Sequence, residues 1–362
     1  METPGILLED IDTPALVIDL DLMEGNIARM ADFFAGVRAT LRPHTKTHKT
    51  PALAHKQIAA GAKGVTCAKL GEAEVMAASG IRDLLVANQV VGRTKIDRLV
   101  ALARHADILV AVDNPDNVRE IAAAAQTVGA TVGMLIEVNV GMNRCGVEPG
   151  EPTLELARLI DRLPGVRFAG LMGYEGHIIA NPDQAVRERE CRKSMTLLTE
   201  AAAYVTQAGL PVDIVSGGGT GTYNITGTFP GVTEVQAGSY LFMDATYHKI
   251  IPEFDCALTV YATVVSRPGD ELAIVDAGLK TMTNEFGLPS VRDIAGATLI
   301  GQSEEHGKLR LDGASVSLRP GDKIHILPSH VCTTINLHDR LYGVRNGRLE
   351  TVWPVAARGK VR

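Results

Sequence analysis

Three features that mark other classes of protein are missing from this 362-residue sequence. No apolar stretch reaches the roughly 18 residues that a membrane-spanning helix needs. No basic run stands out and the formal charge is 36 − 42 = −6, so we expect neither a nucleic-acid partner nor an anionic membrane partner. Residues 1–14 (METPGILLEDIDTP) are acidic and lack a basic segment followed by a long apolar one, so we expect no signal peptide.

Cysteine is scarce, and its pattern argues against a disulfide framework. The cysteines are odd in number and form no CxxC pair; they are Cys67, Cys145, Cys191, Cys256 and Cys332. Scattered cysteines of this kind indicate reduced thiols, so we expect a cytoplasmic protein. The composition, 46% hydrophobic and 22% charged, is that of an ordinary globular protein and excludes long disorder.

Between residues 38 and 245, short apolar runs alternate with longer amphipathic ones. The short runs predict eight strands, at Ala39–His44, Gly64–Leu70, Asp83–Val90, Asp107–Val112, Gly133–Val138, Phe168–Tyr174, Asp213–Gly218 and Glu234–Tyr240. Helical patterns lie between them, as at Arg93–Arg104 and Arg187–Ala208, and only the seventh connection, Thr220–Thr233, lacks one. Apolar strands joined by helices predict a parallel sheet, and eight of them predict a closed, TIM-like (β/α)8 barrel.

The rest of the sequence predicts an all-β domain. From about Cys256 onward, runs such as ALTVYATVVS and ELAIVDAG alternate with turn signals such as RPGD and RNGR. An early apolar run, Pro14–Leu20, precedes the first barrel helix at Leu22–Phe34, and we expect it to join the β-domain. The sequence therefore predicts an α/β barrel over residues 21–248 and a C-terminal β-domain made of residues 1–20 and 249–362.

A lysine follows the first predicted strand, at the end of the barrel where active sites lie. Lys46 stands in RPHTKTHK among Arg42, His44, His48 and Lys49. Neighbouring cations should lower the pKa of its amine, and a neutral amine is what a Schiff base requires. The same residues are also compatible with a solvated basic surface loop.

Glycine-rich segments follow the seventh and eighth predicted strands, where barrels commonly bind phosphate. The first is SGGGTGTY, residues 216–223, and the second is QAGSYLFMD, residues 236–244. Consecutive N–H groups of Gly217, Gly218, Gly219 and Gly221 can form an anion nest, which favours phosphate binding over a simple tight turn.

Polar residues also follow the fifth and sixth predicted strands. Arg144 lies in a glycine-flanked loop, and the sixth strand ends in GYEGH with Tyr174 and His177. They can face a ring or a carboxylate at the barrel mouth, or they can be a surface ion pair and a packed tyrosine.

The β-domain contains one pair of candidate metal ligands. His330 and Cys332 are two residues apart in PSHVCTTINLHD, so in a strand both would face the same way. Two ligands are too few for a closed structural site, and such an ion would keep open positions for substrate. The alternative is a buried cysteine beside a hydrogen-bonded histidine.

Taken together, these segments resemble a known family. The motifs that carry the resemblance are DTPALVIDLDLMEGNIARM, RPHTKTHK, RCGV, SGGGTGTY, EVQAGSYLFMD, VDAGLK, EEHG, PSHVCTTINLHD and LYGVRNGRLETVWPVAARGK. They resemble the fold-type III pyridoxal-phosphate enzymes, the alanine-racemase-like proteins. The match is closer to the branch that holds D-threonine aldolases, 3-hydroxy-D-aspartate aldolases, and D-serine or 3-hydroxyaspartate dehydratases.

The resemblance implies a role for each candidate residue. Lys46 resembles the lysine that binds pyridoxal 5′-phosphate (PLP) covalently, and the implied catalytic residues are Lys46, His330, Tyr174 and Arg144. The implied cofactor-binding residues are Lys46, Arg144, Tyr174, Gly219, Thr220, Gly238, Ser239 and Tyr240. His330 and Cys332 match the family's metal pair. At the second position of this pair, family aldolases often carry Asp and dehydratases carry Cys, as this chain does. Family aldolases typically use Mn²⁺ or Mg²⁺, whereas a thiolate favours softer ions such as Zn²⁺.

The resemblance implies a lyase acting on a small-molecule β-hydroxy-D-amino acid such as D-threonine. The aldolase reading releases glycine and an aldehyde. In the dehydratase reading, Lys46 removes the Cα proton, the ion draws off the β-hydroxyl, and a keto acid and ammonia result. Cys332 is the residue that keeps this alternative open. The resemblance also implies a homodimer with sites at its interface, so His330 can serve either barrel.

Two readings outside this class remain. His44 and His48 can ligate a metal in a barrel hydrolase without PLP. A cofactor carrier of the same barrel fold is the non-enzyme alternative, but such a carrier would lack the β-domain and the metal pair.

Overall fold

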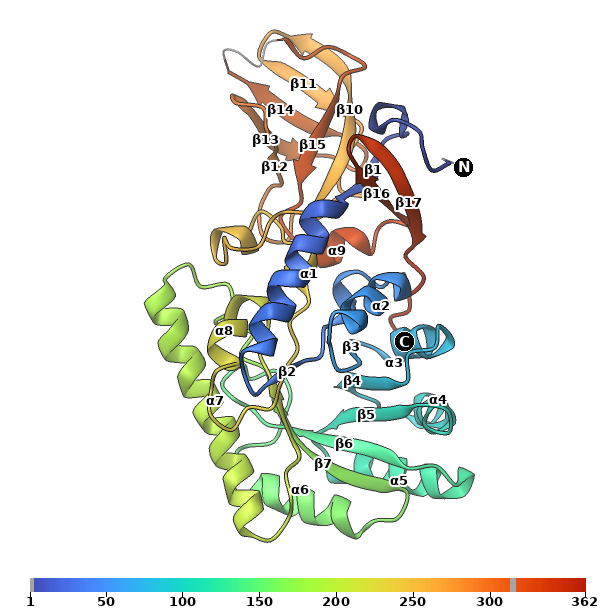
Figure 1. Cartoon of the computed structure of the whole chain (residues 1–362), viewed down its shortest axis with the longest axis vertical. Helices are drawn as coiled ribbons and strands as arrows, with labels where there is room; N and C mark the ends of the chain where they lie inside the picture. Colours follow the sequence, from blue (N-terminus) through green and yellow to red (C-terminus); the bar gives the residue numbers. More distant parts are fainter. Residues whose placement is uncertain (1–2, 313–316) are drawn as a thin grey trace. The chain divides into compact units, whose positions relative to one another are not determined.

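The computed structural model describes residues 3–312 and 317–362, and the chain divides into two compact units (Figure 1). The barrel unit comprises Met30–Lys46, Pro51–Gly238 and Gly359–Arg362, and the β unit comprises the residues up to Arg29, Thr47–Thr50 and Ser239–Arg358. Residues 313–316 of the predicted β-domain lie outside the described residues. Within the described part, no helix is both long and apolar enough to cross a membrane.

All eight predicted barrel strands are present, so that prediction is confirmed. They are β2 (Thr40–Leu41), β3 (Val65–Cys67), β4 (Asp83–Gln89), β5 (Asp107–Val112), β6 (Val132–Glu137), β7 (Val166–Gly173), β8 (Ile214–Gly217) and β9 (Glu234–Val235). Every pairing is parallel, in the order β2-β9-β8-β7-β6-β5-β4-β3. A parallel bridge between His44 and Thr66 links the two end strands and closes the ring.

Helices connect the strands and lie beside them (Figure 1). They are α2 (Pro51–Ala59), α3 (Leu70–Ala78), α4 (Arg93–Ala103), α5 (Pro115–Val128), α6 (Glu151–Arg162), α7 (Gln184–Gln207) and α8 (Tyr223–Thr226). Local sequence sets their ends: Asn114 caps α5 by accepting from the N–H groups of Asp116 and Asn117, and Gly129 at φ +66° ends it.

The seventh connection differs from its prediction. It contains a 3-10 turn, Thr220–Thr222, followed by the one-turn helix α8. A single turn is too short to produce a helical period in the sequence, so the pattern could not reveal it.

Strands β4 to β7 contribute an apolar cluster to the barrel, as buried parallel strands require. Side chains from neighbouring strands, all nearly inaccessible to solvent, form one cluster: Leu85, Leu109, Ala111, Leu135, Ala169 and Met172. At about 25 cal/mol per Å² of apolar surface, this burial supplies the main stabilisation of the sheet.

The β unit is mostly sheet. Its strands are β1 (Ala15–Asp19), β10 (Leu258–Gly269), β11 (Leu272–Val275), β12 (Ser290–Val291), β13 (Ala297–Gln302), β14 (Gly307–Leu311), β15 (Lys323–Leu327), β16 (Arg340–Arg345) and β17 (Arg348–Pro354). β1 pairs antiparallel with β10 and parallel with β16, so the prediction that the early strand joins this sheet is confirmed. Helix α1 (Leu20–Ala35) follows β1, and α9 (Val331–Ile335) interrupts the strands.

A buried arginine connects three strands of the barrel. Arg42, 1% exposed, directly follows β2 and donates to Glu234 of β9 at 2.8 Å and to Asp83 of β4 at 2.5 Å. Glu234 also accepts from Ser216 of β8 at 2.8 Å. Removing one partner of a buried pair leaves an uncompensated charge in a region of low dielectric.

We therefore expect Arg42→Leu to lower the free energy of unfolding by about 3–5 kcal/mol. The variant leaves the buried carboxylate of Glu234 without its cation. Urea unfolding followed by circular dichroism measures the loss. The control is Arg158→Ala, which removes a half-exposed pair with Glu151 and should change stability by less than about 0.5 kcal/mol. Equal losses in both variants would contradict the role assigned to Arg42.

Candidate functional site

Lys46 lies just beyond β2, in a 3-10 turn at Thr45–Thr47. Thr45 anchors this turn, because its hydroxyl donates to the carbonyl of Thr66 at 3.0 Å. The Lys46 amine lies 5.7 Å from the centroid of the Tyr174 ring, which follows β7. The fold thus brings together two candidates that are far apart in the sequence.

Arg144 lies over the same ring, with its guanidinium carbon 5.4 Å from the centroid. Glu137, at the end of β6, forms an ion pair with Arg144 at 3.7 Å. Burial raises the pKa of Glu137, while a hydrogen bond from Gln89 at 2.6 Å acts in the opposite direction. The Lys46 amine and the Arg144 guanidinium therefore both lie over one aromatic ring in the barrel unit.

The glycine-rich loop after β8 is buried and adjoins the same tyrosine. A Cβ at Gly219 would lie 3.5 Å from Tyr174 Cε2, and one at Gly221 would collide with the Ile179 carbonyl. Gly218 has φ +76°, a conformation that favours glycine. Gly219 thus lies next to the Tyr174 ring, while Gly221 is required by the close approach of the Ile179 carbonyl and Gly218 by its backbone conformation.

The predicted anion nest needs a correction, because two of its N–H groups bond within the protein. Gly218 N–H donates to the Glu175 carboxylate at 3.1 Å, and Gly219 N–H donates to Thr222 Oγ1 at 3.3 Å. The loop therefore does not offer an uninterrupted row of donors. Glu175 was missed although it lies inside the GYEGH motif, because one acidic residue at a strand end is indistinguishable in sequence from a surface acid.

The segment after β9 divides between the two units at Gly238 and Ser239. Ser239 begins a 3-10 turn, Ser239–Leu241. Tyr240 is 1% exposed and packs edge-on against Phe254, with ring centroids 5.9 Å apart. Its ring therefore contributes to the core of the β unit.

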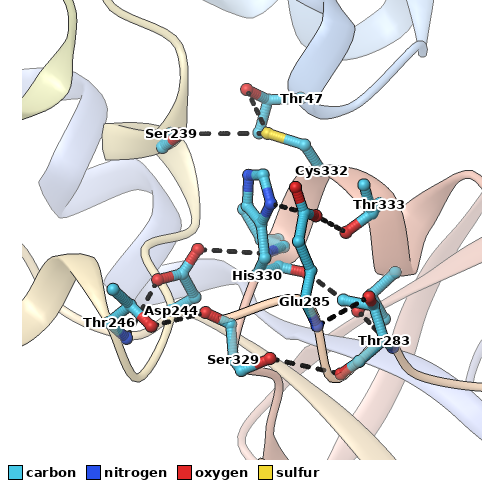
Figure 2. A network of polar contacts seen from close by, with 12 residues as sticks. Thr47, Ser239, Asp244, Thr246, Thr283, Glu285, Ser329, His330, Cys332 and Thr333 are labelled. Carbon is cyan, nitrogen blue, oxygen red and sulfur yellow. Dashed lines mark hydrogen bonds and ion pairs between the residues drawn. The ribbon is translucent and has the colours of Figure 1, made fainter. Parts of the chain in front are cut away.

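The predicted metal pair lies in the β unit, where Figure 2 shows its surroundings. His330 Nδ1 is 2.8 Å from Glu285, and its ring stacks on Phe286 at 4.5 Å between centroids. The Cys332 thiol lies 3.3 Å from the hydroxyl of Thr47, the residue that follows Lys46 in the chain. Burial lowers the pKa of His330, but Cys332 and Glu285 outweigh it and raise this pKa to about 9.

The strand geometry on which the pairing was argued is not the one that the structure shows. His330 is the residue before α9 and Cys332 is inside it, so the two do not alternate along a strand. Their side chains nevertheless interact, since a hydrogen bond with Cys332 is among the causes that raise the pKa of His330.

A distant carboxylate fixes the start of α9. Asp244, fully buried, accepts from the N–H of Val331 at 3.0 Å and from those of Thr246 and Tyr247 at 3.1 and 2.8 Å. Burial raises the pKa of this carboxyl group. Asp244 ends the QAGSYLFMD motif, but nothing local in the sequence connects it to residue 331.

The donor set fits a divalent ion only in part. Over residues 3–312 and 317–362, no group of three or more His, Cys, Asp or Glu has the geometry of a metal site. His330 and Cys332 supply one nitrogen and one sulfur, which suits an ion with open positions. His44 and His48 each accept a backbone N–H through Nδ1, from Lys46 and Thr50, which is a structural contact.

The sequence is similar to known family models and to characterised proteins along nearly its whole length. The alanine racemase N-terminal domain model matches residues 18–246, and a serine dehydratase domain model matches residues 257–344. A D-threonine aldolase of Arthrobacter sp. is 39% identical over 98% of this chain and 95% of its own length. A 3-hydroxy-D-aspartate aldolase of Paracoccus denitrificans is 38% identical over 99% of this chain and 95% of its own length.

Solved structures give the same relationship. The D-threonine aldolase from Filomicrobium marinum superposes with a TM-score of 0.98, at 41% identity over all of both chains. A cysteine-to-alanine mutant of D-threo-3-hydroxyaspartate dehydratase, solved in a metal-free form, has a TM-score of 0.86 at 30% identity, over 96% of this chain and 98% of its own.

The five thiols should differ in reactivity in the folded protein. Burial raises the pKa of Cys191 to about 12 and that of Cys256 to about 11. Partial desolvation also raises the pKa of Cys145, but this side chain is exposed to the reagent. At pH 8 we expect iodoacetamide to modify Cys145 at least tenfold faster than Cys191 or Cys256, since the thiolate is the nucleophile. Peptide mass spectrometry measures the rates. Urea-unfolded protein is the control, in which the rates should converge, and rapid modification of Cys191 in folded protein would contradict the assignment.

Proposed function

The chain belongs to the D-threonine aldolase family of alanine-racemase-like proteins, and on this basis we propose that it cleaves a β-hydroxy-D-amino acid to glycine and an aldehyde. The observation that carries the proposal is the convergence of Lys46 and Arg144 on the ring of Tyr174, beside a glycine-rich loop. The barrel-hydrolase and carrier readings are set aside, because the chain belongs to an aldolase family along nearly its whole length.

The barrel residues fit PLP. Lys46 would hold the cofactor covalently, and Arg144 and Tyr174 would flank its ring. The proposed phosphate contacts in the barrel unit come from Gly219, Thr220 and Gly238, and the family resemblance adds Ser239 and Tyr240 of the β unit. When bound, PLP withdraws electrons from the Cα of an attached amino acid.

Side chains of the protein would orient the cofactor and carry protons. Glu137 holds Arg144 over Tyr174, and this fixes a positive charge beside the space that a ring would occupy. Lys46 would hold the cofactor when no substrate is bound, and its amine would be available to carry a proton while substrate is bound.

We further propose that His330 and Cys332 ligate a divalent ion, Mn²⁺ or Mg²⁺ as in family aldolases, or Zn²⁺ because of the thiolate. Since Nδ1 of His330 faces Glu285, the opposite ring nitrogen, Nε2, would be the ligand. Such an ion would lower the pKa of the substrate's β-hydroxyl.

The dehydratase reaction is the second candidate, and Cys332 is the observation that favours it. Similarity to solved structures favours the aldolase, with a TM-score of 0.98 at 41% sequence identity against 0.86 at 30% for the dehydratase. We also propose that the protein acts as a cytoplasmic homodimer, and that residues 21–248 and the remaining residues are its two domains.

A product assay distinguishes the two reactions. The purified, PLP-supplemented protein is incubated with D-threonine and with D-serine, with and without chelator. Acetaldehyde and glycine in equal amounts are expected from D-threonine, with loss of activity in chelator. A 2-oxo acid and ammonia without glycine would contradict the aldolase. Lys46→Ala is the control: it should lose activity and the visible absorbance that borohydride bleaches.

Alkylation of Cys332 tests the metal pair independently of activity. A bound ion would withdraw the thiolate from reaction, so Zn²⁺ or Mn²⁺ should slow the modification of Cys332 by iodoacetamide at least fivefold, and chelator should restore it. The exposed Cys145 serves as the internal control and should react at one rate throughout. Equal slowing in His330→Ala would show that the ion does not need the pair.

A further inference from the structure

The carboxylate of Glu175 is fully buried, at 0% exposure, and the proposed reaction gives it no role. It lies just beyond β7 and accepts hydrogen bonds from the loop after β8. Gly218 N–H donates to Oε2 at 3.1 Å, and the hydroxyls of Thr222 and Thr226 donate to Oε1 at 2.6 and 2.9 Å. One side chain therefore bonds to three points of the glycine-rich loop and α8.

Its influence extends to the next backbone group. The Thr222 hydroxyl that donates to Glu175 also accepts from Gly219 N–H at 3.3 Å. A negative charge on Glu175 polarises both the bond from the Thr222 hydroxyl and the bond from Gly219 N–H to that hydroxyl. The orientation of two consecutive peptide groups, at Gly218 and Gly219, thus depends on one carboxylate.

A fourth donor completes the environment of Glu175. The Cys191 thiol lies 3.7 Å from Oε1. Burial raises the pKa of Cys191 to about 12, so the thiol stays protonated at neutral pH. These four partners all donate, and they spread the buried charge over one N–H, two O–H and one S–H group.

Only a carboxylate satisfies such a set of donors. An ionised carboxylate accepts through both oxygens, whereas the amide of glutamine presents an NH₂ group on one side. The threonine hydroxyls can turn, but the N–H of Gly218 cannot. If glutamine replaced Glu175, its NH₂ group would face another donor, so one buried polar group would lack an acceptor. The loop would then have to move to relieve this cost.

We propose that Glu175 is a positioning residue for the phosphate of the cofactor. By bonding to the N–H of Gly218, and through Thr222 to that of Gly219, it fixes the backbone of the loop that would present Gly219 and Thr220 to an anion. The inference rests on the proposed function, because it takes the bound anion to be the phosphate of PLP.

The test compares two cofactor forms that differ only in the phosphate. The full-length protein is freed of cofactor and titrated with PLP and with pyridoxal, and visible absorbance gives both dissociation constants. We expect Glu175→Gln to raise the Kd for PLP at least tenfold and the Kd for pyridoxal less than twofold. A change confined to PLP locates the defect at the phosphate, which a general loss of structure would not do.

A matched control is available in the same unit. Glu72 on α3 is 1% exposed and accepts the N–H of Ala68 at 2.7 Å, but it lies outside the glycine-rich loop. Glu72→Gln should leave the ratio of the two dissociation constants unchanged. Equal weakening of PLP and pyridoxal in Glu175→Gln, or no change in either, would overturn the inference.

Thr222→Val covers the case in which Glu175→Gln does not fold. It removes only the hydroxyl between Gly219 N–H and the carboxylate, and the same PLP-selective loss is expected; its absence overturns the inference. A wild-type protein that binds no PLP would instead refute the proposed function. Tight PLP binding by wild type and by the variants alike would refute only the positioning role.

Discussion

The buried charge of Arg42 is the constraint on which the barrel unit depends. Arg42 follows β2 and binds Glu234 of β9 and Asp83 of β4, and Glu234 in turn bonds to Ser216 of β8. An unpaired charge in this environment would cost several kcal/mol, so the strands are held where the ion pairs can form. The loops that carry Lys46 and the glycine-rich segment follow β2 and β8 directly, so their starting points are set by this network.

Beyond the strand ends, buried carboxylates decide the course of the loops. Glu175 holds the glycine-rich loop of the barrel unit, and Asp244 holds the start of α9 in the β unit. In each case an acidic side chain from one segment satisfies backbone N–H groups of another. Loops have no ladder of their own to satisfy these donors, and a buried unsatisfied donor is costly, so the partner must come from elsewhere in the fold.

The sequence predicted the barrel well and its loops less well. Strands buried on both faces are apolar throughout, and this signal is local, so all eight were found. The pairing of His330 with Cys332 was argued for an extended chain, but residues 331–335 form a helix, whose first N–H group, that of Val331, is accepted by Asp244, 87 positions away. The anion nest was likewise predicted from glycines alone, without the carboxylate that turns two of its N–H groups inward.

The order of the strands and the chemical identity of the candidate residues were determined by the sequence itself. The spacing of apolar residues and the turn residues are properties of short segments, so they can be read without knowing which distant groups are in contact. The same is true of the positions of Lys46, Arg144, His330 and Cys332. The tertiary structure alone decided that Lys46 and Arg144 meet over Tyr174, and which backbone donors remain for an anion. Those outcomes depend on pairs of groups far apart in the chain, and only the closed barrel brings such groups within bonding distance.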